Sequence, residues 1–162
     1  MEIRPARPAD LTGITLIYNH YVTASHVTFD VDQFSVAHRV PWFARFDGLR
    51  YQCLVAVEGS NVVGYACSTE FKPKTAYETS VEVSVYLDRQ ATGQGLGTRL
   101  YSALFAALSD RDVHRAYAGI ALPNPGSIAL HEQFGFKQVS HLTEVGRKFG
   151  KYWDVVWLEK PL

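Results

Sequence analysis

The chain has 162 residues, of which 47% are hydrophobic, and its 16 basic residues are balanced by 16 acidic ones. This length supports one hydrophobic core and predicts a single domain over residues 1–162. Because there is no basic excess or long charge run, nucleic acid is not an expected partner. The charged start MEIRPARPAD does not have the pattern of a signal peptide, and no apolar stretch approaches the roughly 20 residues of a membrane span. We therefore expect a cytoplasmic protein with no membrane partner.

Hydrophobic spacing predicts an α/β arrangement in chain order. A short strand begins at Ile3. A helix follows over 10–22, with Asp10 as its N-cap, and a helical pattern after Ser35 is kinked or ended by Pro41. The later elements are two strands within 51–70 joined by a Gly-Ser-Asn turn, a strand over 79–87, a helix over 95–108, a strand over 116–120, a short helix over 127–134, and closing strands within 137–145 and 152–158. This order implies a mixed sheet covered by helices on both faces.

Cysteine and histidine spacing give no indication of a metal or redox site. The only cysteines are Cys53 and Cys67, and each lies in an apolar run that is typical of a strand, without CxxC spacing. Buried free thiols are therefore expected. The histidines outside the segment LHEQFGF do not share a ligand spacing with acidic or thiol partners, so no metal site is expected.

The segment DRQATGQGLGTRLYSAL places Gly93, Gly95 and Gly97 between a predicted strand and a predicted helix. Backbone amides at a helix N-terminus form an anion site, and glycine lets a phosphate approach them closely. The spacing is GxGxG, which differs from the GxGxxG of a Rossmann fold, and the GK[ST] of a Walker loop is missing. The motif alone leaves open both a phosphate-binding turn and a purely structural tight turn.

A valine-rich strand, the GxGxG turn, an amphipathic helix, a strand followed by Asn124 and the segment LHEQFGF come in this order along the chain. This order resembles the acetyl-CoA-binding core of the GNAT acetyltransferases. Within that superfamily, IYNHYVTASHVTF, FKPKTAYETSVEVSVYL, ALPNPGSIALHEQFGF and GRKFGKYWDV are similar to segments of the phosphinothricin and methionine sulfoximine acetyltransferases. The resemblance, which extends from Ile3 to Leu158, implies a GNAT fold: a mixed, mostly antiparallel sheet of about seven strands flanked by about four helices.

The resemblance also implies how the cosubstrate acetyl-CoA would be held. Val85, Tyr86 and Leu87 would offer backbone groups to the pantetheine arm, and Asn124 would hydrogen-bond it. The pyrophosphate would be wrapped by the turn residues Gly93, Gln94, Gly95, Leu96, Gly97 and Thr98. Thr92 stands where the family pattern usually has Arg or Gln, which predicts a somewhat weaker phosphate site.

Glu82 and His131 are the expected catalytic residues. The acceptor amine must lose a proton, and burial of Glu82 in the apolar strand SVEVSVY would raise its pKa toward that of a general base. Glu82 matches the catalytic glutamate of the family, although the strand pattern alone equally allows an exposed-face glutamate. His131, in LHEQFGF, stands where many GNAT enzymes carry a tyrosine as general acid, and would protonate or stabilise the coenzyme A thiolate. A backbone amide of the strand from Glu82 to Leu87 would stabilise the negative charge that develops on the acetyl oxygen during transfer.

The resemblance implies an amino acid or analogue as acceptor, of the phosphinothricin or methionine sulfoximine and sulfone type. Lys72 and Lys74 stand where family members bind a carboxylate or phosphinate, although solvated loop lysines fit the pattern equally well. Phe29 and Tyr77 resemble apolar walls of the substrate pocket, beside the catalytic Glu82. Residues 147–153 resemble a region that contributes to the substrate cleft and to a two-fold dimer, so a homodimer is expected.

Other functions remain open for the same sequence. A GNAT core acetylates a peptide N-terminus, a polyamine or an aminoglycoside in other enzymes, and a degenerate one would bind acyl-CoA as a non-catalytic sensor. The joint presence of Glu82, Asn124 and His131 argues against the sensor, and the nearby lysines favour an anionic amino acid. A plain nucleotide-binding module would respond to ATP or NAD and not to coenzyme A.

Overall fold

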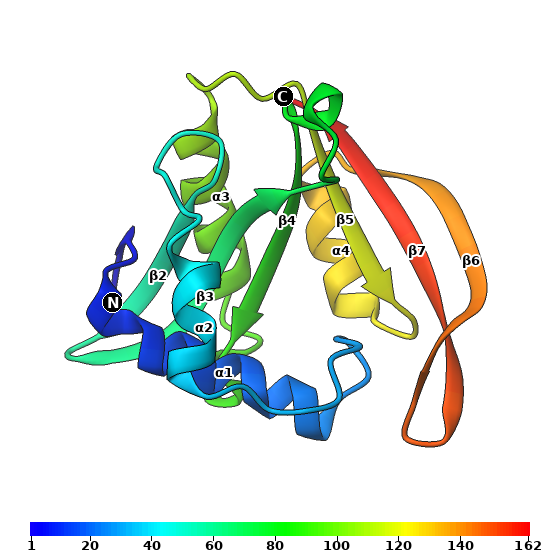
Figure 1. Cartoon of the computed structure of the whole chain (residues 1–162), viewed down its shortest axis with the longest axis horizontal. Coiled ribbons are helices and arrows are strands. Elements are labelled where there is room, and N and C mark those ends of the chain that lie inside the picture. Colours follow the sequence, from blue (N-terminus) through cyan, green and yellow to red (C-terminus); the bar gives the residue numbers. More distant parts are fainter.

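The computed structural model describes residues 1–162, which form a seven-stranded sheet with helices on both faces (Figure 1). The strands follow the order β1-β2-β3-β4-β5-β7-β6, and β4 and β5 form the parallel pair. The strands are β1 (Glu2–Pro5), β2 (Cys53–Glu58), β3 (Asn61–Glu70), β4 (Ser80–Leu87), β5 (Arg115–Ala121), β6 (Lys137–Lys148) and β7 (Lys151–Pro161). The helices are α1 (Leu11–Ala24), α2 (Val36–Phe43), α3 (Leu96–Leu108) and α4 (Pro125–Gln133). This sheet confirms the predicted fold.

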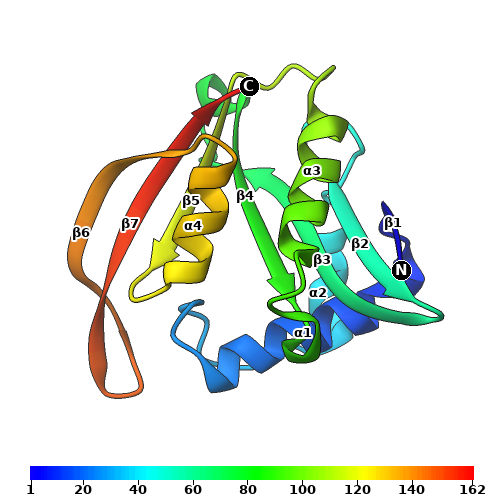
Figure 2. The same ribbon diagram turned by 180° about the vertical axis from the view of Figure 1, so that it is seen from behind.

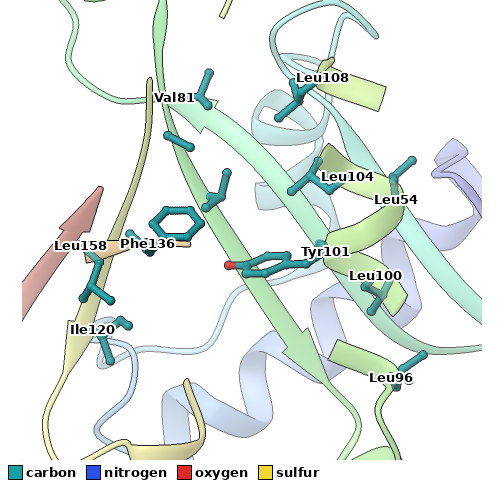
Figure 3. Close-up of a cluster of buried hydrophobic side chains, with 14 of the residues drawn as sticks. Leu54, Val81, Leu96, Leu100, Tyr101, Leu104, Leu108, Ile120, Phe136 and Leu158 are labelled. Carbon is teal, nitrogen blue, oxygen red and sulfur yellow. The ribbon is translucent and has the colours of Figure 1, made fainter. Parts of the chain in front are cut away.

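The helices divide between the two faces of the sheet. Helices α1 and α2 lie on one face, and α3 and α4 lie on the other, as the view from behind makes plain (Figure 2). Leu96, Leu100, Leu104 and Leu108 recur along α3 and are each 2% exposed or less. At this spacing they share one side of the helix, so α3 buries a leucine stripe against the sheet (Figure 3).

The start of α1 differs from the prediction. Asp10 does not cap α1 with its side chain. Its carboxylate pairs with Arg4 (Nη1 to Oδ2 2.7 Å) and accepts a hydrogen bond from the backbone N–H of Arg7 (2.7 Å), so it closes the short 3-10 turn before α1.

Pro41 lies inside α2, which Ser35 caps by accepting from the N–H of His38 (3.1 Å). The helix continues past the proline and ends at Phe43.

The sheet is forked at its parallel pair. Strands β4 and β5 pair only where Ser80–Glu82 lie beside Arg115–Tyr117, whereas β4 stays paired with β3 as far as Leu87. Beyond Glu82 the two strands diverge (Figure 1). The backbone groups of β4 that face β5 therefore lack a sheet partner past this point, and such groups need another partner.

The sheet also buries both cysteines. Cys53 and Cys67 lie opposite each other on β2 and β3, and both are free thiols, as predicted. No helix is long and apolar enough to cross a membrane.

Candidate active site

Two cavities meet at the fork between β4 and β5. The larger, of about 630 Å³, lies on the side of α1 and α2, and the smaller, of about 340 Å³, lies on the side of α3 and α4. Val27, Ser84, Tyr86 and Gly119 line both cavities. A group bound in one cavity can therefore reach the other through the gap between the strands.

Strand β4 divides its side chains between the two faces. Val81 and Val83 join the core under α3, while Glu82, Ser84 and Tyr86 line the larger cavity. This follows from the alternation of side chains along a strand. The same alternation that buries the valines therefore places a carboxylate in a cavity wall.

Glu82 stands at the vertex of the fork. It is the last residue of β4 that pairs with β5, opposite Tyr117. Its carboxylate takes part in none of the ion pairs of the protein, and burial raises its pKa. A half-buried carboxylate without a cation beside it holds a proton more readily than an ordinary glutamate, which is the property of a general base.

The glycine-rich turn leads into α3 at the mouth of the smaller cavity. Gly93 and Gly95 have φ angles of 73° and 72°, in the left-handed region that glycine adopts most readily. Gly95 is the N-cap of α3, and Gly97 packs so closely on Leu130 that a Cβ would lie 3.2 Å from its Cδ2. The turn thus leads directly into the first amides of α3, which at a helix N-terminus have no partner within the helix and can bind an anion.

The structure places the predicted cosubstrate contacts in two groups. Those that line the smaller cavity are Val85, Tyr86, Leu87, Gly93, Gly97 and Asn124. Those outside its lining are Gln94, Gly95, Leu96 and Thr98. Leu96 is 2% exposed and belongs to the core. Asn124 caps α4 by accepting from the N–H of Ser127 (3.2 Å), which leaves its amide N–H groups available to the cavity.

His131 also lines the smaller cavity, and its proton has a defined position. Nδ1 lies 2.7 Å from the carbonyl oxygen of Ser127, which can only accept, so Nδ1 carries the hydrogen. Burial lowers the pKa of His131, which keeps the ring neutral at pH 7. Nε2 must then accept, and the hydroxyl of Tyr101 donates to it across 2.9 Å.

Tyr101 is a residue that the sequence analysis missed. It lies on the core side of α3 beside Leu100 and is fully buried, so its position is typical of a packing residue. Its hydroxyl oxygen nevertheless points away from the helix, toward the side of the cluster that holds Ile120 and Leu158 (Figure 3). A tyrosine in an otherwise aliphatic leucine stripe was the available indication, because a buried hydroxyl needs a partner.

The predicted substrate residues lie in two places. Phe29 lines the larger cavity, and its ring packs directly on the Cα of Gly146. Lys72, Lys74 and Tyr77 are exposed and lie outside the lining of this cavity. The Nζ of Lys72 sits 5.3 Å from the ring centres of both Phe71 and Tyr77. The substrate role of these three residues stays a prediction.

Helices α1 and α2 add polar side chains to the larger cavity that the sequence analysis missed. The hydroxyl of Tyr18 donates to Asp30 and lies 2.7 Å from Oγ1 of Thr28. Arg39, on α2, lines the same cavity beside Trp42. No group of three or more His, Cys, Asp or Glu side chains is arranged to hold a metal ion.

A forked sheet with one cavity below a glycine-rich helix N-terminus, and a second cavity beside a half-buried carboxylate, is the arrangement of a group-transfer enzyme, and its similarity to known proteins gives its class. Residues 3–157 match the model of the acetyltransferase (GNAT) domain. A phosphinothricin N-acetyltransferase of Streptomyces coelicolor is 47% identical over 165 residues, covering 100% of this chain and 96% of that protein. The chain therefore belongs to the GNAT acetyltransferase family, and it is an N-acetyltransferase.

Two further similarities agree with this assignment. An L-methionine sulfoximine/L-methionine sulfone acetyltransferase of Pseudomonas paraeruginosa is 34% identical over 162 residues, covering 99% of this chain and 94% of that protein. The crystal structure of a GNAT superfamily phosphinothricin acetyltransferase from Sinorhizobium meliloti, in complex with AcCoA, superposes with a TM-score of 0.94. It is 33% identical and covers 99% of this chain and 88% of that one. The resemblance inferred from the motifs is thus confirmed.

Proposed function

We propose that this protein acetylates the α-amino group of an amino acid or analogue, of the phosphinothricin or methionine sulfoximine and sulfone type, by direct transfer from acetyl-CoA. The observation that carries the proposal is Glu82, a carboxylate without an ionic partner, placed where the two cavities meet. The names of the relatives support the substrate class.

The smaller cavity has the groups that acetyl-CoA requires. The backbone of Val85–Leu87, free of a sheet partner toward β5, would hold the pantetheine arm, and the amide of Asn124 would add a donor. The amides that begin α3 would hold the pyrophosphate. The hydroxyl of Thr92 donates to the carbonyl of Arg89 (2.9 Å), so this site relies on backbone amides. When bound, acetyl-CoA supplies the thioester that makes the acetyl group reactive.

Glu82 acts in this proposal as the general base. An amino acid amine arrives protonated at pH 7, and only the neutral amine is a nucleophile. Glu82 would accept this proton in the larger cavity, directly or through a water molecule, and its raised pKa brings its affinity for the proton closer to that of the amine. The strand amides past Glu82 would stabilise negative charge that develops on the acetyl oxygen.

Tyr101 and His131 act on the leaving thiolate as a pair. Neutral His131 has no hydrogen on Nε2, so it has no proton to give toward Tyr101. The Tyr101 hydroxyl would turn its single hydrogen from Nε2 of His131 to the departing sulfur, and the contact with His131 would hold the hydroxyl in place until then. This assignment refines the expectation that His131 itself protonates the thiolate.

A cytoplasmic homodimer completes the proposal. Strands β6 and β7 and their hairpin turn expose five large apolar side chains, which are Val139, Leu142, Val145, Phe149 and Tyr152. Several large apolar side chains exposed on one hairpin are typical of an interface. Light scattering coupled to size-exclusion chromatography should give twice the chain mass of 18.1 kDa, and a Phe149→Asp, Tyr152→Asp double variant should give the single mass. A monomeric wild-type protein would contradict the dimer.

The experiment that tests the activity is a thiol-release assay with acetyl-CoA. The acceptors are phosphinothricin, methionine sulfoximine, methionine sulfone, the common amino acids, spermidine, an aminoglycoside and a peptide with a free N-terminus. Turnover confined to the amino acid group is the expected result. Turnover of the peptide or of the cationic amines alone would replace the proposed substrate class, and acetyl-CoA binding without any turnover would indicate a sensor.

A further inference from the structure

Arg39 is a buried cation with no acidic partner. Its side chain lies on α2, and the residue is only 6% exposed. None of the ion pairs includes it, and its Nε–H has no hydrogen-bond partner. Buried arginines are normally paired, because taking a charge out of water without compensation is costly. An unpaired guanidinium in a cavity wall is therefore suited to bind an anion.

Aromatic rings hold the guanidinium in position. Its carbon lies 3.9 Å from the ring centre of Trp42, 4.7 Å from that of Tyr18 and 5.7 Å from that of Phe34. Such contacts partly offset the loss of hydration. Aromatic rings do not use up the hydrogen bonds of the terminal N–H groups, which therefore stay available for the paired hydrogen bonds that an oxyanion accepts.

The nearby carboxylate does not neutralise Arg39. Asp30 also lines the larger cavity, but it accepts the hydroxyl hydrogen of Tyr18 and forms no ion pair with Arg39. The larger cavity thus contains a cation whose N–H groups no protein oxygen satisfies.

Arg39 and Glu82 act on different parts of the cavity. The guanidinium contacts the ring of Tyr18, and that ring lies 5.1 Å from the ring of Tyr86. Tyr86 stands four residues past Glu82 on β4, on the same side of the strand. At about 3.3 Å per residue, four residues of a strand span roughly 13 Å. The cation therefore lies beside a part of the cavity wall that is distant from the carboxylate at which the acceptor amine would bind.

We propose that Arg39 binds the oxyanion at the far end of the acceptor side chain, and that it makes the enzyme select amino acids with an anionic side-chain group such as a phosphinate or carboxylate. This inference rests on the proposed function, in which the acceptor amine lies at Glu82. It assigns the side-chain anion to a residue inside the cavity and not to the exposed Lys72 and Lys74.

Phosphinothricin and methionine sulfone form a matched pair of acceptors for the test. They share one carbon skeleton, and they differ in that the first ends in an anionic methylphosphinate and the second in a neutral methylsulfone. Arg39→Gln should lower kcat/KM for phosphinothricin roughly 10- to 100-fold, the effect of losing hydrogen bonds to a charged group. It should change the value for methionine sulfone by less than about threefold. Arg39→Lys should fall between wild type and Arg39→Gln for phosphinothricin.

The control is Arg45→Gln, which removes an exposed arginine just beyond α2 that pairs with Glu70 (3.1 Å). It should leave both values unchanged. An equal loss on both acceptors with Arg39→Gln would assign Arg39 to the α-carboxylate or to packing and would overturn the proposal. Unchanged values with both acceptors would overturn it as well.

A binding measurement distinguishes failure of this proposal from failure of the proposed function. The ring of Trp42 lies on the Arg39 guanidinium, so tryptophan fluorescence should report binding of either compound without turnover. If wild type acetylates neither compound, the proposed function fails. Tighter binding of phosphinothricin than of methionine sulfone, lost in Arg39→Gln, would still support the anion site. Equal binding to wild type and variant would overturn it.

Discussion

Replacing Glu82 with glutamine is expected to lower kcat about 10²- to 10⁴-fold, the usual contribution of a general base. The amide keeps the shape of the side chain but does not accept the proton of the acceptor amine. Thiol release at saturating acetyl-CoA and acceptor measures the effect. Because the larger cavity keeps its lining, the KM of the acceptor should change much less than kcat.

The pH dependence of the wild-type enzyme should report the same group. Only ionised Glu82 accepts a proton, so kcat should rise with pH through the pKa of this carboxyl. Burial raises that pKa, so the rise should lie above the ordinary glutamate value of about 4.3. The rise should be missing in Glu82→Gln. A variant that kept the wild-type kcat and pH profile would exclude Glu82 as the base.

The free energy of unfolding should fall with rising pH over the range in which kcat rises. A raised folded-state pKa means that Glu82 stabilises the fold fully below its unfolded-state pKa, and that this contribution is lost as pH rises through the folded-state pKa. Glu82→Gln should therefore unfold at the same temperature as wild type or slightly above it at pH 7. Glu70→Gln is the matched control: it removes a carboxylate of the adjacent strand whose ion pair with Arg45 is exposed, and kcat should be unchanged.

The regular elements were predictable because their periodicity is set by burial. The leucines of α3 recur at helical spacing, and β4 alternates valines with Glu82, Ser84 and Tyr86. The alternation placed Glu82 on the side of β4 away from the valines, but it equally allowed an exposed-face glutamate, and the resemblance to the family favoured a catalytic role. That this side opens into a cavity follows from how α1 and α2 lie over it, which the local pattern does not contain.

Other parts of the site depend on long-range geometry that local patterns do not contain. The fork requires β4 and β5 to separate after Glu82, and their register follows from the packing of the whole sheet. Asp10 had the sequence of an N-cap but is drawn to Arg4, a residue of β1. Arg39 lies in a short helix with an internal proline, where spacing gave no clear buried side.

Lys72 and Lys74 show that closeness to the catalytic strand along the chain does not by itself predict closeness in space. They precede β4 closely, yet the segment turns so that Phe71 stacks on Tyr117 (4.3 Å between ring centres) and Lys72 rests against Phe71 and Tyr77. Closeness to the catalytic strand along the chain therefore did not place these lysines in the lining of the larger cavity.

Replacing Tyr101 with phenylalanine is expected to lower kcat about 10- to 100-fold, the scale of a hydrogen bond to a charged group. The ring keeps its contacts with Phe105 and Phe134, but the hydroxyl that would stabilise the departing thiolate is removed. The buried Nε2 of His131 also loses its donor, which should cost about 1–3 kcal/mol of stability. Thiol release at saturating acetyl-CoA and thermal unfolding measure the two effects, and Tyr51→Phe controls for loss of a tyrosine hydroxyl outside both cavities.

His131→Gln distinguishes the two members of the pair. The glutamine side chain still offers an acceptor to Tyr101, so if His131 only positions the hydroxyl, this variant should retain more activity than Tyr101→Phe. The double variant should then be no slower than Tyr101→Phe, because residues that act as a unit are not additive. If His131→Gln were inactive while Tyr101→Phe kept nearly the wild-type kcat, the imidazole itself would transfer the proton, and the hydrogen on Nδ1 would have to move to Nε2 during catalysis.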